Sequence, residues 1–125
     1  MSKILVAEDN PINRELLREI LEAARYEITE AANGQEALAK LHEQLPDLIL
    51  LDINMPVMDG FAAIRAIREN PQWRRIPVLA VTAYAMKHDR ERVMVAGFDG
   101  YVAKPIEAGA LLSAIKHVLS KAVPS

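Results

Sequence analysis

The chain has 125 residues, of which 51% are hydrophobic and 26% charged, and this predicts one globular domain with a sizeable core. Its net charge of −2 at pH 7 gives no electrostatic reason to expect direct binding to nucleic acid or to an anionic membrane. Cysteine is absent, which excludes disulfides, thiolate metal sites and cysteine nucleophiles. The N-terminal stretch matches neither a signal peptide nor a membrane span, so we expect a soluble, cytoplasmic protein.

The first predicted unit is a strand over residues 3–7 followed by a helix. The apolar run of the strand does not alternate, which is typical of a strand buried on both faces. Asn10 is suited to cap the helix, and Pro11 is suited to its first position, because an N–H there would have no helical partner. Glu8 and Asp9 therefore lie at the junction of strand and helix. The apolar stripe of this helix comprises Ile12, Leu16, Leu17, Ile20, Leu21 and Ala24.

Two similar units follow along the chain. Residues 26–31 alternate between polar and apolar side chains, which predicts a half-exposed edge strand, and Asn33 is a suitable N-cap for the next helix. Residues 48–51 form another unalternating apolar run, and a strand is favoured over a helix because the run is short and bracketed by prolines. We expect this strand to lie at the centre of the sheet and to end at Asp52.

The second half of the chain repeats the alternation. Residues 59–60 predict the start of a third helix, and residues 77–82 predict a fourth strand. The fourth helix is expected from about Met86 to Ala96, with Gly97 just beyond its end, and a fifth strand follows from Tyr101. The last helix is marked by Leu111, Leu112, Ile115, Val118 and Leu119.

The single tryptophan and the three histidines are expected to take no part in chemistry. Trp73 lies between two prolines, where packing on the surface is the ordinary outcome. No two histidines share the spacing of metal ligands, so exposed helix positions are expected for His42, His88 and His117.

Five strand signals that alternate with five helix signals predict an α/β fold. The expected architecture is a five-stranded parallel sheet with right-handed crossovers and helices on both faces. The pattern extends over residues 1–125 without a repeat, a low-complexity run or a linker. We therefore expect one domain with no output domain attached.

Four of the five predicted strands deliver a polar residue to their carboxyl end, where open α/β sheets bind ligands. These residues are Glu8 with Asp9, Asp52, Thr82 and Lys104. Three crowded carboxylates are unfavourable unless a cation is bound, and a set of oxygen ligands favours Mg²⁺. Lys104 is suited to bind a phosphoryl oxygen, and Thr82 can donate a hydrogen bond to the same group.

This set predicts a site that accepts a phosphoryl group on a carboxylate. Such a reaction needs a nucleophile, charge neutralisation and positioning rather than a strong base. Asp52 is the best candidate for the nucleophile because it lies on the central strand, and Asp9 is better suited to bind the metal beside Glu8. Taken alone, Asp52 would be interpreted as a carboxylate that caps the next turn, and the neighbouring carboxylates reverse that interpretation.

The edge residues and the turns after them form a recognisable set of motifs. They are residues 8–10, Asp52 with Met55, Pro56, Asp59 and Gly60, residues 81–83, and Tyr101 with Lys104 and Pro105. Over its whole length the chain resembles the receiver domain of the response regulator family of two-component signalling, especially single-domain regulators of the chemotaxis type. The resemblance implies a flavodoxin-like sheet of strand order 2-1-3-4-5.

The resemblance also assigns the chemistry. It implies that Asp52 accepts a phosphoryl group from a histidine kinase or a phosphotransfer protein. Mg²⁺, with Mn²⁺ as a substitute, would be held by Asp9, Asp52 and the carbonyl of Asn54, with Glu8 assisting. Lys104 matches the lysine that contacts the phosphate, and the bond that follows it resembles one that is cis in the family.

The resemblance further implies how the signal leaves the site. Thr82 and Tyr101 match the family's switch pair, and a downstream protein would bind the surface built by the fourth and fifth helices. Asn54 and Tyr84 are the positions expected to flank the acyl phosphate and to tune its lifetime. We expect shielding by the Tyr84 ring to prevail over orientation of water by Asn54.

Two other classes of protein share parts of this pattern. A Mg²⁺-dependent phosphatase of the haloacid dehalogenase type also uses an aspartate nucleophile, but it has a second acid two residues on, where this chain has Asn54. A flavodoxin-like cofactor carrier needs a phosphate loop rich in Ser, Thr and Gly, whereas residues 8–11 would repel phosphate. We therefore expect no enzyme, but a signalling phospho-acceptor that catalyses only its own phosphorylation and dephosphorylation.

Overall fold

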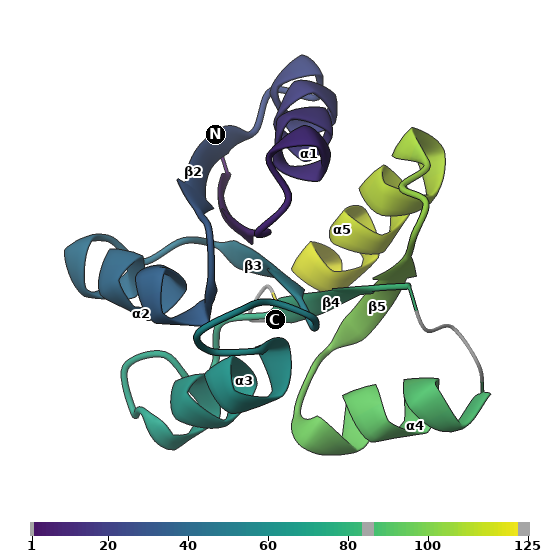
Figure 1. Cartoon of the computed structure of the whole chain (residues 1–125). Helices are drawn as coiled ribbons and strands as arrows, with labels where there is room; N and C mark the ends of the chain where they lie inside the picture. The colour runs from purple at the N-terminus through teal and green to yellow at the C-terminus, as the bar shows by residue number, and fades with distance from the viewer. Residues whose placement is uncertain (1, 84–86, 123–125) are drawn as a thin grey trace.

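The computed structural model describes residues 2–83 and 87–122, with the backbone alone for residues 87–89 and 122. The described residues form five strands that alternate with five helices (Figure 1). In chain order these elements are β1 (Lys3–Ala7), α1 (Pro11–Ala23), β2 (Glu27–Ala31), α2 (Gly34–Glu43), β3 (Leu48–Asp52), α3 (Gly60–Glu69), β4 (Val78–Thr82), α4 (Lys87–Ala96), β5 (Gly100–Ala103) and α5 (Ala108–Ala122). The expected alternation is thus confirmed.

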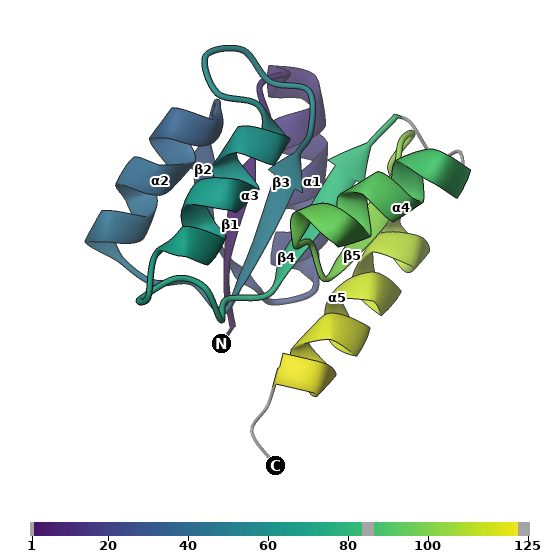
Figure 2. The same cartoon turned by 90° about the horizontal axis from the view of Figure 1, so that it is seen from below.

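The five strands form one parallel sheet in the order β2-β1-β3-β4-β5. Helices α1 and α5 pack on one face, and α2, α3 and α4 pack on the other (Figures 1 and 2). Every residue of β3 is buried, as a central strand requires, whereas β2 alternates in burial along the sheet edge. The strand order and the two helical layers agree with the prediction. No helix among the described residues is long and apolar enough to cross a membrane.

The helix starts follow the expected capping chemistry. The Asn10 side chain accepts hydrogen bonds from the first free N–H groups of α1, and Asn33 and Asp59 do the same for α2 and α3. Gly97 ends α4 with a φ of +112°, a left-handed conformation that glycine adopts without steric cost. The boundary of α4 agrees with the prediction at its C-terminal end, while Met86 lies outside the described residues.

The predicted stripe of α1 is wrong at Ile12 and Leu16. Ile12 is 77% exposed and Leu16 is 38% exposed, whereas Leu17 and Leu21 are buried against the sheet. At ~100° per residue, Ile12 lies about 140° around the helix from Leu17, so one helix cannot bury both against the same sheet. The apolar set read from the sequence was wider than the face that the sheet covers.

Trp73 is also placed differently from the prediction, because it is only 4% exposed and belongs to the core beneath α2 and α3. Backbone hydrogen bonds from Trp73 to Asn70 and from Ile76 to Trp73 fold the connection into tight turns that direct the indole inward. The ring meets the edge of the His42 ring at a centroid distance of 4.7 Å. His42 and His117 are exposed, as expected, and the side chain of His88 lies outside the described part.

Arg68 joins several connections at the amino edge of the sheet, opposite the carboxyl ends of the strands. Its guanidinium donates hydrogen bonds to the carbonyls of Gly97 (2.9 Å), Arg74 (2.9 Å) and Ile76 (2.7 Å). It also forms an ion pair with Asp99 at 2.8 Å. One side chain therefore satisfies carbonyl groups that would otherwise lack a helical or strand partner.

The loop between β3 and α3 contains a strained residue. Val57 has a φ of +69°, which is rare for a β-branched side chain, and it is 76% exposed. The N–H of Met58 donates to the carbonyl of Pro56 at 2.7 Å, so Val57 is the centre of a tight three-residue turn. Its side chain gains little from burial that would offset the strain.

Val57→Gly is expected to raise the free energy of unfolding by about 1 kcal/mol. Relief of a strain of about 1–3 kcal/mol should exceed the entropic cost of a glycine, about 0.5–1 kcal/mol. Urea denaturation of both proteins measures the difference. Val95→Gly is the matched control, because Val95 is also exposed but helical, and this change should lower stability. A Val57→Gly variant no more stable than the parent would show that the turn is not strained.

Candidate functional site

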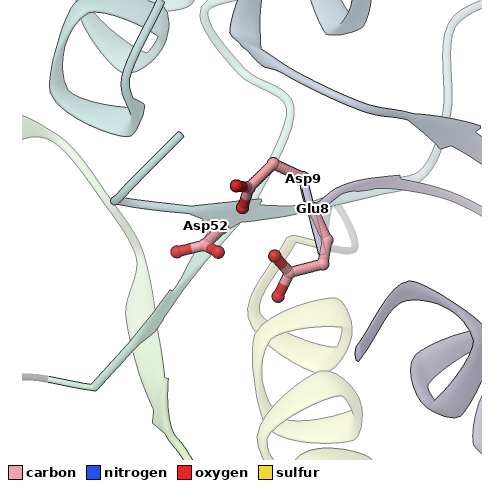
Figure 3. A group of neighbouring side chains, drawn as sticks. All are labelled: Glu8, Asp9 and Asp52. Atoms are coloured by element: carbon pink, nitrogen blue, oxygen red, sulfur yellow. The ribbon is translucent and has the colours of Figure 1, made fainter. Parts of the chain in front are cut away.

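The sheet brings four of the predicted site residues together at its carboxyl edge. Glu8 and Asp9 follow β1, and Asp52 is the last residue of β3. One oxygen from each of these three carboxylates lies within 4.8 Å of the others (Figure 3). Lys104, which follows β5, reaches the same place, with its ammonium nitrogen 2.8 Å from Oδ2 of Asp52. The rule that neighbouring parallel strands gather their carboxyl ends thus holds for this set.

Asp52 is buried and is held by two different contacts. Its side chain is close to fully buried, at 2% exposure for the residue. Oδ1 accepts the N–H of Asn54 at 3.0 Å, and Oδ2 accepts a hydrogen bond from Lys104. The turn-capping contact that a lone aspartate would make is therefore present together with the ion pair. These contacts fix the rotamer of the carboxylate at the centre of the site.

Glu8 lies deepest in the site, at 1% exposure. Its Oε2 accepts the N–H of Asn10 at 3.2 Å. Its Oε1 lies 3.0 Å from the Lys104 nitrogen, as an ion pair without good hydrogen-bond geometry, and this buried oxygen accepts no hydrogen bond among the described residues. The pKa of Glu8 is raised to about 7, chiefly by burial and also by the Asp52 carboxylate, while Lys104 and the N–H of Asn10 act in the opposite direction.

Lys104 is the cation that compensates Glu8 and Asp52. Burial lowers the pKa of Lys104, but its contacts with Asp52 and Glu8 outweigh this effect, so the pKa is raised overall. The ammonium group therefore stays charged at neutral pH. One cation beside three carboxylates leaves the site negative and able to attract a further cation.

The side chains at this edge fit Mg²⁺. The donors are all carboxylate oxygens, which is the chemistry that Mg²⁺ prefers. Oε1 of Glu8 is buried and faces the Lys104 ammonium without accepting a hydrogen bond among the described residues, so it keeps lone pairs for a second cation. Asp9 is exposed and so contributes a carboxylate on the solvent side, where the ion could keep some of its water.

Thr82 and Tyr101 lie on the same face of neighbouring strands. Thr82 is the buried last residue of β4, and Tyr101 pairs with Ala80, two residues before it. The Tyr101 ring is half-buried, and its hydroxyl accepts a hydrogen bond from Arg90 of α4 at 3.0 Å. The predicted switch pair is thus adjacent to both the site and α4. Tyr84, the predicted shield of the phosphate, lies outside the described residues.

A cavity of about 250 Å³ lies beside the site, between α3 and α4. Asn54, Asp59, Thr82 and Arg92 line it together with apolar side chains. The Arg92 guanidinium lies 5.0 Å from the centroid of the Phe61 ring, a cation–π contact that links α4 to α3. No local signal in the sequence could have placed Arg92 over a ring of another helix.

The bond between Lys104 and Pro105 is cis, as the resemblance implied. The sheet order and the acids and lysine gathered at its carboxyl edge fit a receiver domain, the class of small signalling domain that the sequence resembles. The model of the response regulator receiver domain matches residues 4–116, so the chain belongs to that family.

Individual relatives agree with this classification. The chain is 40% identical over 119 residues to the polar-differentiation response regulator DivK of Brucella anthropi, a match that covers 95% of this chain and 97% of that protein. It is 36% identical to the receiver domain of a signal transduction histidine kinase from Syntrophus aciditrophicus, with a TM-score of 0.91 over 100% of this chain and 95% of that one.

A third similar protein was solved with a bound metal ion. The receiver domain of the sensor histidine kinase PA1611 from Pseudomonas aeruginosa was solved with a magnesium ion coordinated in its active-site cleft. It is 36% identical, with a TM-score of 0.88 over 95% of this chain and 98% of that one. The chain is thus a phosphorylation-activated receiver of the kind found in two-component systems, and its acidic cluster has the oxygen ligands that Mg²⁺ prefers.

Proposed function

We propose that Asp52 is the residue that accepts the phosphoryl group. The observation that carries this proposal is the position of its carboxylate, buried at the end of the central strand between the acidic pair and Lys104. A carboxylate oxygen of Asp52 would attack the phosphorus as the bond to the donor histidine nitrogen breaks, and the nitrogen would keep the electron pair. Incubation with acetyl phosphate and Mg²⁺, followed by intact mass, tests the assignment.

The residues around Asp52 would position and neutralise the transferred group. Lys104 would contact a phosphoryl oxygen, and Thr82 would donate a hydrogen bond to it. Asp9, Asp52 and the carbonyl of Asn54 would hold Mg²⁺, with Glu8 assisting, and Mn²⁺ would substitute because it also prefers oxygen ligands. When bound, the ion would offset the negative charge of the acids and of the phosphoryl group.

Asp9→Ala is expected to weaken Mg²⁺ binding roughly tenfold, which corresponds to ~1.4 kcal/mol. The same change should raise metal-free stability slightly, by less than about 1 kcal/mol, because it removes one of three crowded anions while the exposed side chain is screened by water. Thermal melts with and without Mg²⁺ measure both effects. Glu15→Ala removes an exposed acid of α1 outside the cluster and should change neither. Loss of metal-free stability in Asp9→Ala would contradict the crowding of the acids.

We further propose that Thr82 and Tyr101 couple phosphorylation to a partner surface on α4 and α5. Met94 and Val95 of α4 are exposed apolar residues, and Met94 lines a shallow groove with Arg90 and Tyr101. A phosphoryl group that draws Thr82 toward it would vacate space for the Tyr101 ring and so change this groove. The downstream protein would recognise that change.

Thr82→Ala should accept the phosphoryl group but lose most of the response at α4 and β5. The variant keeps Asp52 and Lys104 but removes the hydroxyl that would follow the phosphate. Amide spectra before and after acetyl phosphate measure the response of residues 90–103. Thr29→Ala, an exposed threonine of β2, is the matched control and should behave as the parent. A phosphorylation response of normal size in Thr82→Ala would remove the pair from the mechanism.

Residues 1–125 would form one receiver domain that acts in the cytoplasm, without direct contact to nucleic acid or membrane. The domain would catalyse only its own phosphorylation and dephosphorylation, since Asn54 stands where an aspartate-based phosphatase has its second acid. The effects of Asn54 and Tyr84 on the lifetime of the phosphoryl group stay a prediction.

A further inference from the structure

We propose that Arg14 of α1 is a positioning residue for the metal-binding acids, an inference that rests on the proposed function of this edge. The guanidinium of Arg14 donates a hydrogen bond from Nη1 to the carbonyl oxygen of Glu8 at 2.9 Å. Its Nε lies 3.8 Å from Oε1 of Glu30 on β2. Arg14 therefore links the junction between β1 and α1 to the neighbouring edge strand.

The bond to the Glu8 carbonyl fixes more than one residue. That carbonyl belongs to the planar peptide group between Glu8 and Asp9, so its orientation fixes where the Asp9 Cα lies and thereby limits the directions open to the Asp9 side chain. On the other side, the N–H of Glu8 donates to the carbonyl of Ala31 at 3.0 Å. The backbone of Glu8 is thus held from both directions, by β2 through its N–H and by Arg14 through its carbonyl.

Arg18 provides a natural comparison on the same helix. It also pairs with Glu30, with its Nη1 3.4 Å from Oε2, and it has a second acidic partner in Glu22. Arg18 is more exposed than Arg14, and it contacts the carboxylates of Glu22 and Glu30. Loss of Arg18 removes a cation and an ion pair with Glu30 but leaves the bond to the Glu8 carbonyl intact.

Charge and positioning predict opposite outcomes when Arg14 is removed. A cation near the acids repels Mg²⁺, so a purely electrostatic role would make Mg²⁺ bind more tightly after Arg14→Met. A positioning role would make it bind more weakly, because the Glu8–Asp9 peptide would lose the contact that orients both acids. Outer contacts of this kind typically change metal affinity by ~10–100-fold, and the opposing charge effect reduces our expectation to roughly 3–10-fold weaker binding.

The experiment is a titration of the full chain with MgCl₂ at constant ionic strength, followed through the amide shifts of residues 52–54. Arg14→Met is expected to bind Mg²⁺ 3–10-fold more weakly than the parent, and Arg18→Met is expected to bind within about twofold of it. Arg14→Lys keeps the charge but loses the planar guanidinium, which donates to the Glu8 carbonyl through Nη1 while its Nε faces Glu30, so at least threefold weaker binding is expected as well.

Equal or tighter binding by Arg14→Met would overturn the proposal, as would equal effects of Arg14→Met and Arg18→Met. If Arg14→Met does not fold, the test uses Arg14→Lys instead. A Mg²⁺ affinity of Arg14→Lys equal to that of the parent would overturn the proposal. A parent chain that shows no Mg²⁺-dependent shifts at residues 52–54 would instead refute the metal site itself. The two failures are therefore distinguishable.

Discussion

Asp52→Asn is expected to abolish the gain of phosphoryl mass on incubation with acetyl phosphate and Mg²⁺. An amide has no anionic oxygen to attack the phosphorus, and it is a poorer metal ligand than a carboxylate. The variant should fold, because the amide oxygen can still accept the N–H of Asn54 and because one of the crowded acids loses its charge. Loss of labelling would therefore report lost chemistry rather than lost structure.

Asp59→Asn is the matched control for this experiment. Asp59 lies in the loop that follows Asp52 and caps α3 by accepting the N–H of Ala62, a role that asparagine also fills. This variant should label as the parent does. Labelling that survives Asp52→Asn, with a site of attachment on another acid, would move the phospho-acceptor away from the central strand.

Lys104→Met should destabilise the metal-free protein strongly at pH 8 and much less at pH 6. The change leaves two buried carboxylates, Glu8 and Asp52, without their cation. Removal of one partner of a buried ion pair costs about 3–5 kcal/mol, and the partial exposure of Lys104 reduces our expectation to about 2–4 kcal/mol at pH 8. At pH 6 most Glu8 side chains carry a proton, so only one buried charge is left unpaired.

The sign of the pH effect follows from the pKa of Glu8. Its folded-state pKa, about 7, lies above the ordinary value of 4.5, so between these pH values the folded chain binds more protons than the unfolded chain. This contribution to stability is complete below pH 4.5 and is lost as pH rises through 7. Lys104 lowers the pKa of Glu8, so this pKa should be higher in Lys104→Met than in the parent. The stability of the variant should therefore continue to fall at pH values where that of the parent has already levelled off.

Urea denaturation in the presence of a chelator at pH 6 and pH 8 measures the effect. Lys116→Met, which removes an exposed lysine of α5, is the control and should change stability little at either pH. An equal loss at both pH values for Lys104→Met would mean that the lysine stem stabilises the chain by packing rather than by its charge.

The central features of the site could be predicted from the sequence because they depend on strand ends. Unalternating apolar runs mark buried strands, and the first polar residue after each run falls at the carboxyl edge. Glu8, Asp52 and Lys104 were placed in this way, and the structure brings them into contact. The capping residues are local signals too, and Asn10 and Asn33 act as expected.

The contacts that sequence reasoning missed join residues far apart in the chain. Trp73 was expected on the surface, yet its ring is buried against His42. Arg92 of α4 lies over the Phe61 ring of α3, a contact that no motif in the sequence indicated. Neither contact follows from a helical or strand period, because each depends on how separate elements pack. The predicted burial of Ile12 was wrong for a related reason. Periodicity identifies apolar positions but not the width of the helix face that the sheet covers.

Arg68 ties together the connections at the amino edge of the sheet, so the backbone at this edge should open at a higher free energy than the backbone at the carboxyl edge. At the amino edge Asp99 and Val78 exchange two hydrogen bonds, both 2.8 Å, beside the Arg68 guanidinium. Their amides should exchange with deuterium only through global unfolding. The strained loop around Val57 at the other edge should exchange through small local openings. A chain built in this way can deform the edge that receives a signal while the opposite edge preserves the fold.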